Sequence, residues 1–142
     1  MSGATTAVAQ AGRRAAGTGS IVGALVLDAT LVVLFAWLGR SEHAREATLG
    51  GLFGTAWPFL AALTVVWIAA AVFRRPLAPL RSGLPVWLGT VALGLALRGL
   101  GGGGLALPFV VVTAVALGAF LVGWRLIAAL LRRLPARAER TR

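Results

Sequence analysis

The sequence contains no cysteine, no lysine, one histidine and only four acidic residues among its 142 positions. The missing cysteines exclude disulfides and thiolate metal sites. A single histidine without cysteine supplies too few ligands for an ordinary zinc site, so we expect no metal. No nucleophile–base pair or carboxylate pair stands in a plausible catalytic arrangement either. We therefore expect a protein that is not an enzyme and carries no cofactor.

Charge is scarce, because charged residues make up 13% of the chain while hydrophobic residues make up 58%. An average soluble domain has about 45–50% apolar residues even when glycine is counted. We therefore expect lipid to be the solvent for much of the surface. The net charge of +10 comes from arginine alone. A basic chain can bind nucleic acid or a membrane surface, but these arginines flank apolar runs, which favours the bilayer and not nucleic acid.

Four apolar runs are long enough to cross a bilayer, which takes about 20 mostly apolar residues. They are Ser20–Gly39, Leu49–Phe73, Leu84–Gly101 and Leu105–Leu131. We therefore predict an all-α fold, a four-helix transmembrane bundle over residues 20–131. Residues 1–19 are predicted to form a disordered cytoplasmic tail and residues 132–142 a basic cytoplasmic tail.

The arginines are distributed unevenly between the two sides of such a bundle. Ten fall on the side of the termini and the second loop, namely Arg13, Arg14, Arg74, Arg75, Arg81, Arg132, Arg133, Arg137, Arg140 and Arg142. Two, Arg40 and Arg45, fall in the first loop. The positive-inside rule predicts that both termini are cytoplasmic, in the cell membrane. This imbalance disfavours dimers that insert in both orientations, so any homo-oligomer is expected to be parallel. The C-terminal arginines are expected to bind anionic lipids.

Asp28, Arg98 and Arg125 fall within the predicted spans, where a central charge costs about 2.5–3.5 kcal/mol on insertion scales. A rise of about 1.5 Å per residue puts Asp28 roughly 12 Å and Arg125 roughly 10 Å from the inner ends of their helices. These matching depths predict an Asp28–Arg125 ion pair that shares the desolvation. Two roles remain open for this pair: a clamp that fixes helix packing, and a gate or proton-linked switch.

Arg98 lies near the predicted outer end of the third span, within reach of the interface. Residues at similar depth or in the first loop are Thr55, Trp57, Arg40 and His43. In one interpretation Arg98 reaches the interface or pairs with Glu42 or Glu46. In the other, Arg98, Arg40 and His43 line an outward-facing pocket that attracts an anion.

Glycine and proline set the expected turns and breaks. The run Gly101–Gly104 lacks the Lys-[Ser/Thr] that completes a phosphate-binding loop, so we expect a flexible outer turn with little chemical content. The stretch "RSGLP" at Arg81–Pro85 is expected to be a turn before a helix that starts at Pro85. Pro58 removes the hydrogen bond to the Gly54 carbonyl and predicts a break in the second span.

The tryptophans and small residues are expected to serve packing. Trp37, Trp57, Trp67, Trp87 and Trp124 are predicted to be packing or interfacial anchors. The spacings Gly50-x-x-x-Gly54 and Ala114-x-x-x-Gly118 would let helix backbones approach closely.

Several of these residues recur together in one known family. The matching pieces are Asp28 with Phe35, "GR..H" at Gly39, Arg40 and His43, "TAWPF" at Thr55–Phe59, Trp87 with Arg98, and "GWR" at Gly123–Arg125. On these pieces the chain resembles the small bacterial and archaeal membrane proteins grouped as domain of unknown function 3054, over about residues 20–130. The resemblance implies no activity. It implies that the family shares one design, to which the following residues belong: Asp28, Arg40, His43, Thr55, Pro58, Arg98 and Arg125.

Two functions fit these observations. The leading hypothesis is a passive channel or carrier for a small solute or anion, because intramembrane charges and proline-broken helices recur at transport sites. The alternative is a non-transporting assembly or accessory protein whose buried charges specify packing. The alternative predicts that exchanging the charges of Asp28 and Arg125 restores folding.

Overall fold

The computed structural model describes residues 16–41 and 48–134, and all regular structure in these two segments is helical. The elements are α2 (Thr18–Ser41), α3 (Leu49–Ala69), the 3₁₀ turn η1 (Val72–Arg74), the π-helical turn η2 (Pro79–Gly83), α4 (Leu84–Leu100) and α5 (Leu107–Arg133). Four helices, with η2 counted into α4, are long and apolar enough to cross a membrane. The predicted all-α four-helix bundle is confirmed. Most of both predicted tails lies outside the described residues.

Several helix boundaries differ from those expected. Helix α3 ends at Ala69, before Phe73, because Ala71 adopts a left-handed conformation with φ of 48° that turns the chain into η1. The "RSGLP" stretch is helical rather than a turn, since Pro79 begins η2 and α4 follows directly at Leu84. Proline suits the first turn of a helix, where its missing N–H has no partner to lose.

The two predicted tail boundaries also shift. Helix α2 begins at Thr18, two residues before the predicted span, and α5 continues through Arg132 and Arg133 instead of ending before them.

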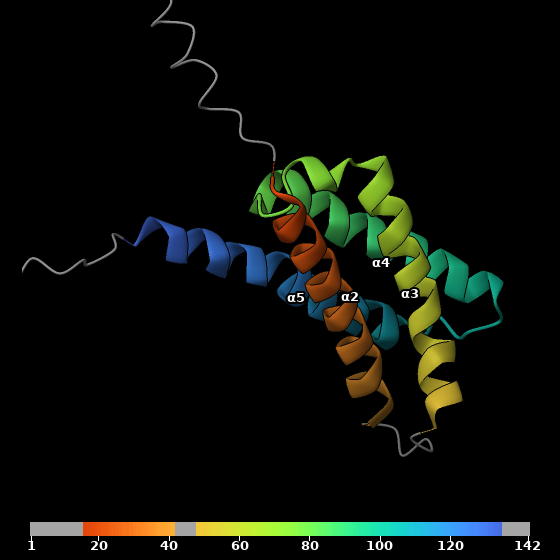
Figure 1. Ribbon diagram of the computed structural model, residues 1–142. Coiled ribbons are helices and arrows are strands. Elements are labelled where there is room, and N and C mark those ends of the chain that lie inside the picture. The colour runs from red at the N-terminus through yellow and green to blue at the C-terminus, as the bar shows by residue number, and fades with distance from the viewer. Residues whose placement is uncertain (1–15, 42–47, 135–142) are drawn as a thin grey trace, which may run out of the picture.

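The four helices form a closed ring of neighbours. Helix α2 packs on α3 and α5, α3 packs most extensively on α4, and α4 packs on α5. Figure 1 shows α2 and α3 running alongside one another, with α4 and α5 crossing behind them. The last turns of α5, in blue, extend beyond the bundle (Figure 1). Since α2 and α5 are the first and last helices, their contact closes the bundle.

Each helix buries one face, because residues three or four apart lie on the same side. The buried face of α5 carries Thr113, Leu117, Leu121 and Arg125 in steps of four. The same spacing buries Phe59, Leu63 and Trp67 on α3, and Ala24, Asp28 and Val32 on α2. The opposite faces expose leucine, valine and isoleucine. An apolar exterior of this kind matches helices that are surrounded by lipid.

Glycine permits the closest approaches inside the bundle. A Cβ on Gly94 would collide with the ring of Phe59, and a Cβ on Gly118 would lie 2.8 Å from the Trp87 indole. The predicted Ala114-x-x-x-Gly118 spacing is thus used within the bundle, where Trp87 also donates to the Ala114 carbonyl at 2.8 Å. By contrast, among the described residues and apart from the backbone of its own helix, no atom would lie within 4 Å of a Cβ on Gly50 or on Gly54.

Pro58 does not interrupt α3, which is helical from Leu49 to Ala69. The predicted interruption of the second span at Pro58 is therefore not observed, because the helix continues through this residue. Pro58 is buried in the bundle, where neighbouring helices can compensate for the hydrogen bond that proline removes.

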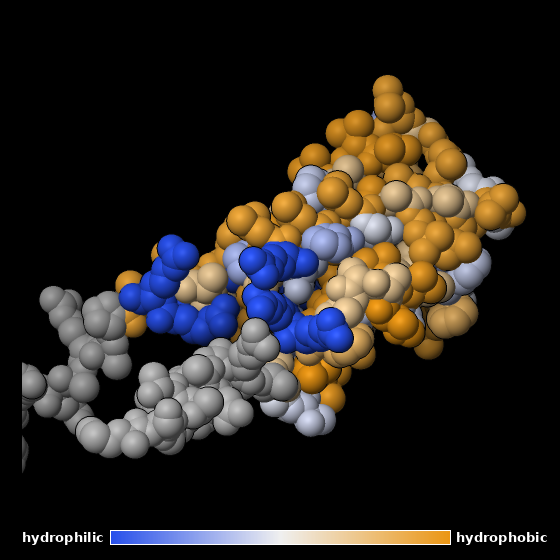
Figure 2. All heavy atoms as spheres, turned by 90° about the horizontal axis from the view of Figure 1, so that it is seen from above, coloured by the Kyte–Doolittle hydropathy of each residue, from blue (hydrophilic) through white to orange (hydrophobic). Residues whose placement is uncertain are grey.

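One end of the bundle is rich in arginine. It carries the start of α2, the α3–α4 connection and the end of α5, and its exposed arginines are Arg74, Arg75, Arg81, Arg132 and Arg133. Figure 2, viewed from this end, shows hydrophilic side chains gathered there beside an otherwise apolar surface. Arg132 Nη2 donates to the Leu77 carbonyl at 3.3 Å and so links α5 to the connection. The positive-inside rule predicts that this end is cytoplasmic.

The contact between Phe59 and Gly94 gives a test of the packing. We expect Gly94→Ala to destabilise the protein by about 1–3 kcal/mol, because the added methyl overpacks a filled core. The matched control is Gly54→Ala, whose added methyl meets no neighbouring atom within 4 Å in segments 16–41 and 48–134, its own helix backbone aside. Thermal unfolding in detergent should show a lower midpoint for Gly94→Ala and an unchanged or slightly higher one for Gly54→Ala. Equal midpoints would contradict the packing described.

Candidate functional site

Asp28 and Arg125 form a fully buried ion pair between α2 and α5. The guanidinium is bidentate: Nη1 donates to Oδ1 at 2.8 Å and Nη2 donates to Oδ2 at 2.7 Å. Both side chains are 0% exposed. The ion pair that was predicted from the matching depths of Asp28 and Arg125 is therefore a direct contact. Paired charge-assisted hydrogen bonds of this geometry are among the strongest in proteins.

Backbone carbonyls hold Arg125 in place. Its Nε donates to the Pro76 carbonyl at 2.9 Å, and its Nη1 donates to the Leu121 carbonyl at 2.7 Å. Pro76 lies in the α3–α4 connection, so the route of that connection supplies an acceptor. Gly83 supplies space, because a Cβ there would lie 3.3 Å from the Arg125 Cδ. The guanidinium carbon also lies 4.5 Å from the centroid of the Trp124 ring.

Two tryptophans complete the surroundings of Asp28. Trp67 donates from Nε1 to Oδ2 at 2.9 Å, and Trp124 donates from Nε1 to Oδ1 at 2.8 Å. Each carboxylate oxygen therefore accepts two hydrogen bonds, which fills the roughly four acceptor positions of the group. No acceptor position is left for a substrate or a proton relay in this conformation. The geometry favours the clamp over the gate.

Sequence reasoning missed the polar role of these two tryptophans, which were expected only as anchors. A signal was available for Trp67. The arithmetic that pairs Asp28 with Arg125 also puts Trp67 roughly 9 Å from the inner end of its predicted span, at a similar depth. Trp124 is adjacent to Arg125, but whether its indole N–H reaches Asp28 depends on side-chain geometry.

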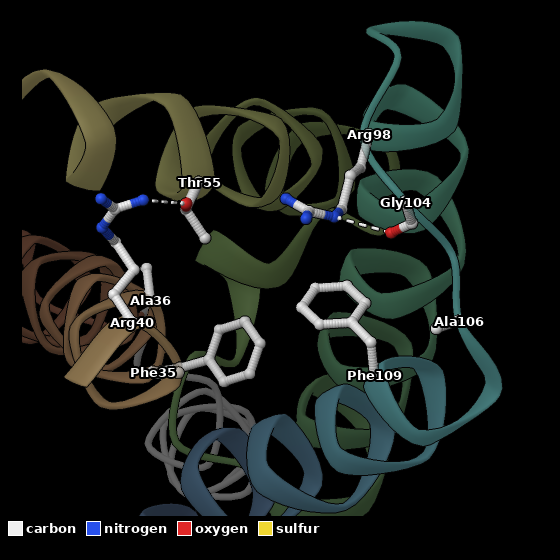
Figure 3. A pocket seen from close by; sticks show the side chains of 9 residues that line it. Phe35, Ala36, Arg40, Thr55, Arg98, Gly104, Ala106 and Phe109 are labelled. Carbon is white, nitrogen blue, oxygen red and sulfur yellow. Dashed lines mark hydrogen bonds between the residues drawn. The ribbon is translucent and has the colours of Figure 1, made fainter. Parts of the chain in front are cut away.

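A pocket with a volume of about 260 Å³ lies at the end of the bundle opposite the exposed arginines. Its lining residues are Phe35, Ala36, Gly39, Arg40, Thr55, Arg98, Gly104, Ala106 and Phe109. The residues come from α2, α3, α4, the α4–α5 turn and α5, so every helix contributes. We call it the Arg40–Arg98 pocket. Its walls are mostly apolar, and two guanidinium groups face it from separate helices (Figure 3).

Polar contacts orient the two arginines. Arg40 donates from Nη1 to the Thr55 hydroxyl at 3.5 Å, and Arg98 donates from Nε to the Gly104 carbonyl at 3.2 Å. The Arg98 guanidinium carbon also lies 4.4 Å from the centroid of the Phe109 ring. In Figure 3 the rings of Phe35 and Phe109 face the space between the arginines from α2 and α5.

The glycine run contributes more to this site than expected. Gly102 has a φ of 78°, which favours glycine, and Gly103 donates from its N–H to the Arg98 carbonyl at 2.8 Å. A Cβ on Gly103 would lie 2.6 Å from the Arg98 Cγ. The predicted turn is confirmed, and it also packs on Arg98, since its Gly104 carbonyl accepts from the Arg98 guanidinium.

The structure brings together part of the predicted outer site. Arg40, Thr55 and Arg98 line one pocket. Trp57 does not line it and is 40% exposed. His43, Glu42 and Glu46 lie outside the described residues. Within segments 16–41 and 48–134, no three histidine or acidic side chains gather where they could hold a metal ion.

Mostly apolar side chains lie between the pocket and the ion pair. Along α5, Phe109 and Arg125 are about 24 Å apart at a rise of about 1.5 Å per residue. Leu117 and Leu121, both 0% exposed, lie between them. On α2, Val32 lies between Phe35 and Asp28 and is equally buried. The lining of the pocket includes neither member of the ion pair.

Four helices long and apolar enough to cross a membrane are the mark of a multi-pass helical membrane protein. The chain belongs to the family described as "Protein of unknown function (DUF3054)", whose model matches residues 25–128. The resemblance seen in the sequence is thus confirmed, and the matched segment contains both the ion pair and the whole pocket. Comparison with curated proteins and with solved structures gave no match.

The clamp makes a prediction about charge exchange. Arg125→Leu leaves the Asp28 carboxylate buried without its cation, and we expect a loss of about 3–5 kcal/mol of stability. Exchange of the pair by Asp28→Arg and Arg125→Asp should not restore stability. Trp67 and Trp124 direct N–H donors at position 28, and a guanidinium accepts no hydrogen bond. Unfolding in detergent would measure both effects.

Arg133→Leu is the matched control, since Arg133 is exposed at the end of the same helix. Its stability should remain close to that of the wild type. An exchanged pair as stable as the wild type would contradict the geometry, although it is what a purely electrostatic packing role predicts.

Proposed function

We propose that the protein is a passive channel or carrier for a small anion and that the Arg40–Arg98 pocket is its outer binding site. One observation carries the proposal: two guanidinium groups from separate helices line one cavity of about 260 Å³ within an apolar wall. Pockets for drug-sized ligands have volumes of about 300–1,000 Å³, so this cavity suits a smaller ligand. The predicted orientation opens the pocket toward the outside.

The side chains indicate a carboxylate or another small oxyanion. A guanidinium is planar and presents paired donors that match the two oxygens of a carboxylate. The low dielectric of the apolar wall strengthens this attraction relative to water. Thr55 adds a hydroxyl, and Phe35 and Phe109 add an apolar surface. A small monocarboxylate would use both kinds of surface.

The elements around the pocket also fit transport. Thr55 lies three residues before Pro58 on α3, and proline inside a membrane helix removes one backbone hydrogen bond without ending the helix here. Arg98 is held by the turn through the Gly103 N–H and the Gly104 carbonyl. Glycine turns can change conformation at little steric cost, so this turn could move Arg98 during a transport cycle.

The alternative function, a non-transporting assembly or accessory protein, is supported by the clamp. The carboxylate of Asp28 is saturated by four donors in the protein, as expected of a charge that specifies packing. Both functions accommodate a clamp. The pocket discriminates between them, because only the transport hypothesis requires it to bind an anion.

Arg98→Ala tests the proposed function. We expect wild-type protein in liposomes to carry acetate or nitrate, and the variant to bind and carry these anions at least tenfold more weakly, since a hydrogen bond to a charged group contributes about 1.5–3 kcal/mol. Arg98→Lys should be intermediate, because lysine keeps the charge without the planar fork. Isothermal titration would measure binding and a liposome assay would measure flux.

Arg133→Ala, a change at the opposite end of the protein, should leave both quantities unchanged. If the wild type binds neither anion, or if Arg98→Ala matches it, the proposal is wrong. Glu42→Gln and Glu46→Gln separate the two interpretations of Arg98. Anion binding should persist in both variants, whereas a role limited to an intrachain ion pair would couple these glutamates to stability without any anion binding.

We also propose that the arginine-rich end contacts anionic lipid headgroups. Each basic residue near an anionic surface contributes about 1 kcal/mol. The double variant Arg132→Gln with Arg133→Gln should therefore retain phosphatidylglycerol about 30-fold more weakly at low ionic strength. Native mass spectrometry would compare retention of phosphatidylglycerol with that of phosphatidylcholine, whose retention should not change. Equal loss of both lipids, or of neither, would contradict the proposal.

A further inference from the structure

Two buried hydroxyl groups stand out among the threonines of the helices. Thr90 on α4 and Thr113 on α5 are 0% exposed, and in the described part of the chain neither Oγ1 atom has a hydrogen-bond partner. Other helical threonines satisfy their hydroxyls locally: Thr30 donates to the Val26 carbonyl at 2.7 Å, and Thr64 to the Leu60 carbonyl at 2.9 Å. A buried polar group without a partner costs about 1–3 kcal/mol, so this pair calls for a functional explanation.

Both hydroxyls follow the Arg40–Arg98 pocket inward on the helices that line it. Thr113 lies one turn after Phe109 on the buried face of α5. Thr90 lies two turns before Arg98 on α4, and Gly94 lies between them on the same buried face. Helices α4 and α5 pack on each other. Measured along its own helix, Thr113 lies roughly 6 Å beyond Phe109, and Thr90 lies roughly 12 Å beyond Arg98.

A pair of aromatic rings, Phe35 and Phe59, lies between the pocket and the deeper threonine, Thr90. Phe35 lines the pocket, and its ring meets the Phe59 ring edge-on, with the centroids 5.5 Å apart. The Phe59 ring in turn packs directly on Gly94. Phe59 is 0% exposed and Phe35 is 5% exposed. Since Gly94 lies midway between Arg98 and Thr90 on α4, the Phe59 ring packs between the depth of the pocket and the depth of Thr90.

We infer that Thr90 and Thr113 form an inner site for the same small anion, which enters it from the Arg40–Arg98 pocket when the Phe35–Phe59 pair moves aside. This inference rests on the proposed function and names the second binding position on the route. Hydroxyl groups donate hydrogen bonds, so they can replace water around an anion that has left the guanidinium groups. With the rings in contact, the inner site is occluded and its hydroxyls have no partner.

A purely structural role would leave different traces. A threonine kept for packing can be replaced by valine, which has nearly the same shape. Removing a hydroxyl that has no partner should leave stability unchanged or increase it. A hydroxyl needed for transport should instead affect flux. The two roles therefore predict opposite patterns in stability and transport.

The experiment uses Thr90→Val and Thr113→Val, with Thr90→Ser and Thr113→Ser as matched controls that keep a hydroxyl. Full-length protein in liposomes would be assayed for acetate and nitrate flux, for equilibrium binding of the same anions, and for its unfolding midpoint. We expect each valine variant to lower flux about tenfold, corresponding to the loss of one hydrogen bond to a charged ligand. Binding at the outer pocket should be unchanged, the midpoint equal or higher, and both serine variants close to wild type. Phe35→Ala should raise flux.

The outcomes separate this inference from the proposed function. Normal flux in both valine variants, with pocket binding intact, would overturn the inner site and leave the outer site standing. A lower unfolding midpoint in the valine variants would show that the hydroxyls serve folding and would also overturn it. Absence of acetate and nitrate binding in the wild type would overturn both proposals together.

Discussion

The arrangement of the bundle depends on one buried interaction, the ion pair between Asp28 and Arg125. It joins the first helix to the last at 0% exposure. Trp67 brings α3 into the same cluster, and the Pro76 carbonyl brings in the α3–α4 connection. Charges in a bilayer are tolerated only when they are paired or face a polar interior. Because the acceptors and donors come from separate segments, satisfying Asp28 and Arg125 fixes the relative positions of all these segments.

The two ends of the bundle use arginine differently. Arg125 is surrounded by acceptors of the protein itself, since Asp28, Leu121 and Pro76 all accept from it. Arg98 and Arg40 also donate to protein acceptors, the Gly104 carbonyl and the Thr55 hydroxyl, and in addition they line a cavity with aromatic and small residues. The mostly apolar layer between the two ends separates them, so the clamp can fix the fold while the proposed anion pocket adjusts to a ligand. Under the proposed function, one pair of charges serves packing and the other serves anion binding.

Sequence reasoning predicted the parts that follow from length, hydropathy and depth. The four helices and the contact between Asp28 and Arg125 follow from counting residues along apolar runs. Other features depend on side-chain direction or on backbone detail, which counting does not provide. The indole N–H groups of Trp67 and Trp124, the π-helical turn before α4 and the acceptor at Gly104 are of this kind. The pocket was predicted in part, since Arg40, Thr55 and Arg98 lie together, but its aromatic walls at Phe35 and Phe109 emerge only once four helices are assembled.

The absence of cysteine allows a direct test of the central claim, which is that a pocket at one end of the bundle opens outward and binds a small anion while the core beneath it is closed. Ala106→Cys places a thiol in the pocket lining, and Leu121→Cys places one in the core. With a membrane-impermeant maleimide added outside intact cells, we predict rapid labelling of Ala106→Cys, slowed by acetate or nitrate, and no labelling of Leu121→Cys. Labelling of Ala106→Cys only from the cytoplasmic side, or at a rate that neither anion changes, would contradict the account.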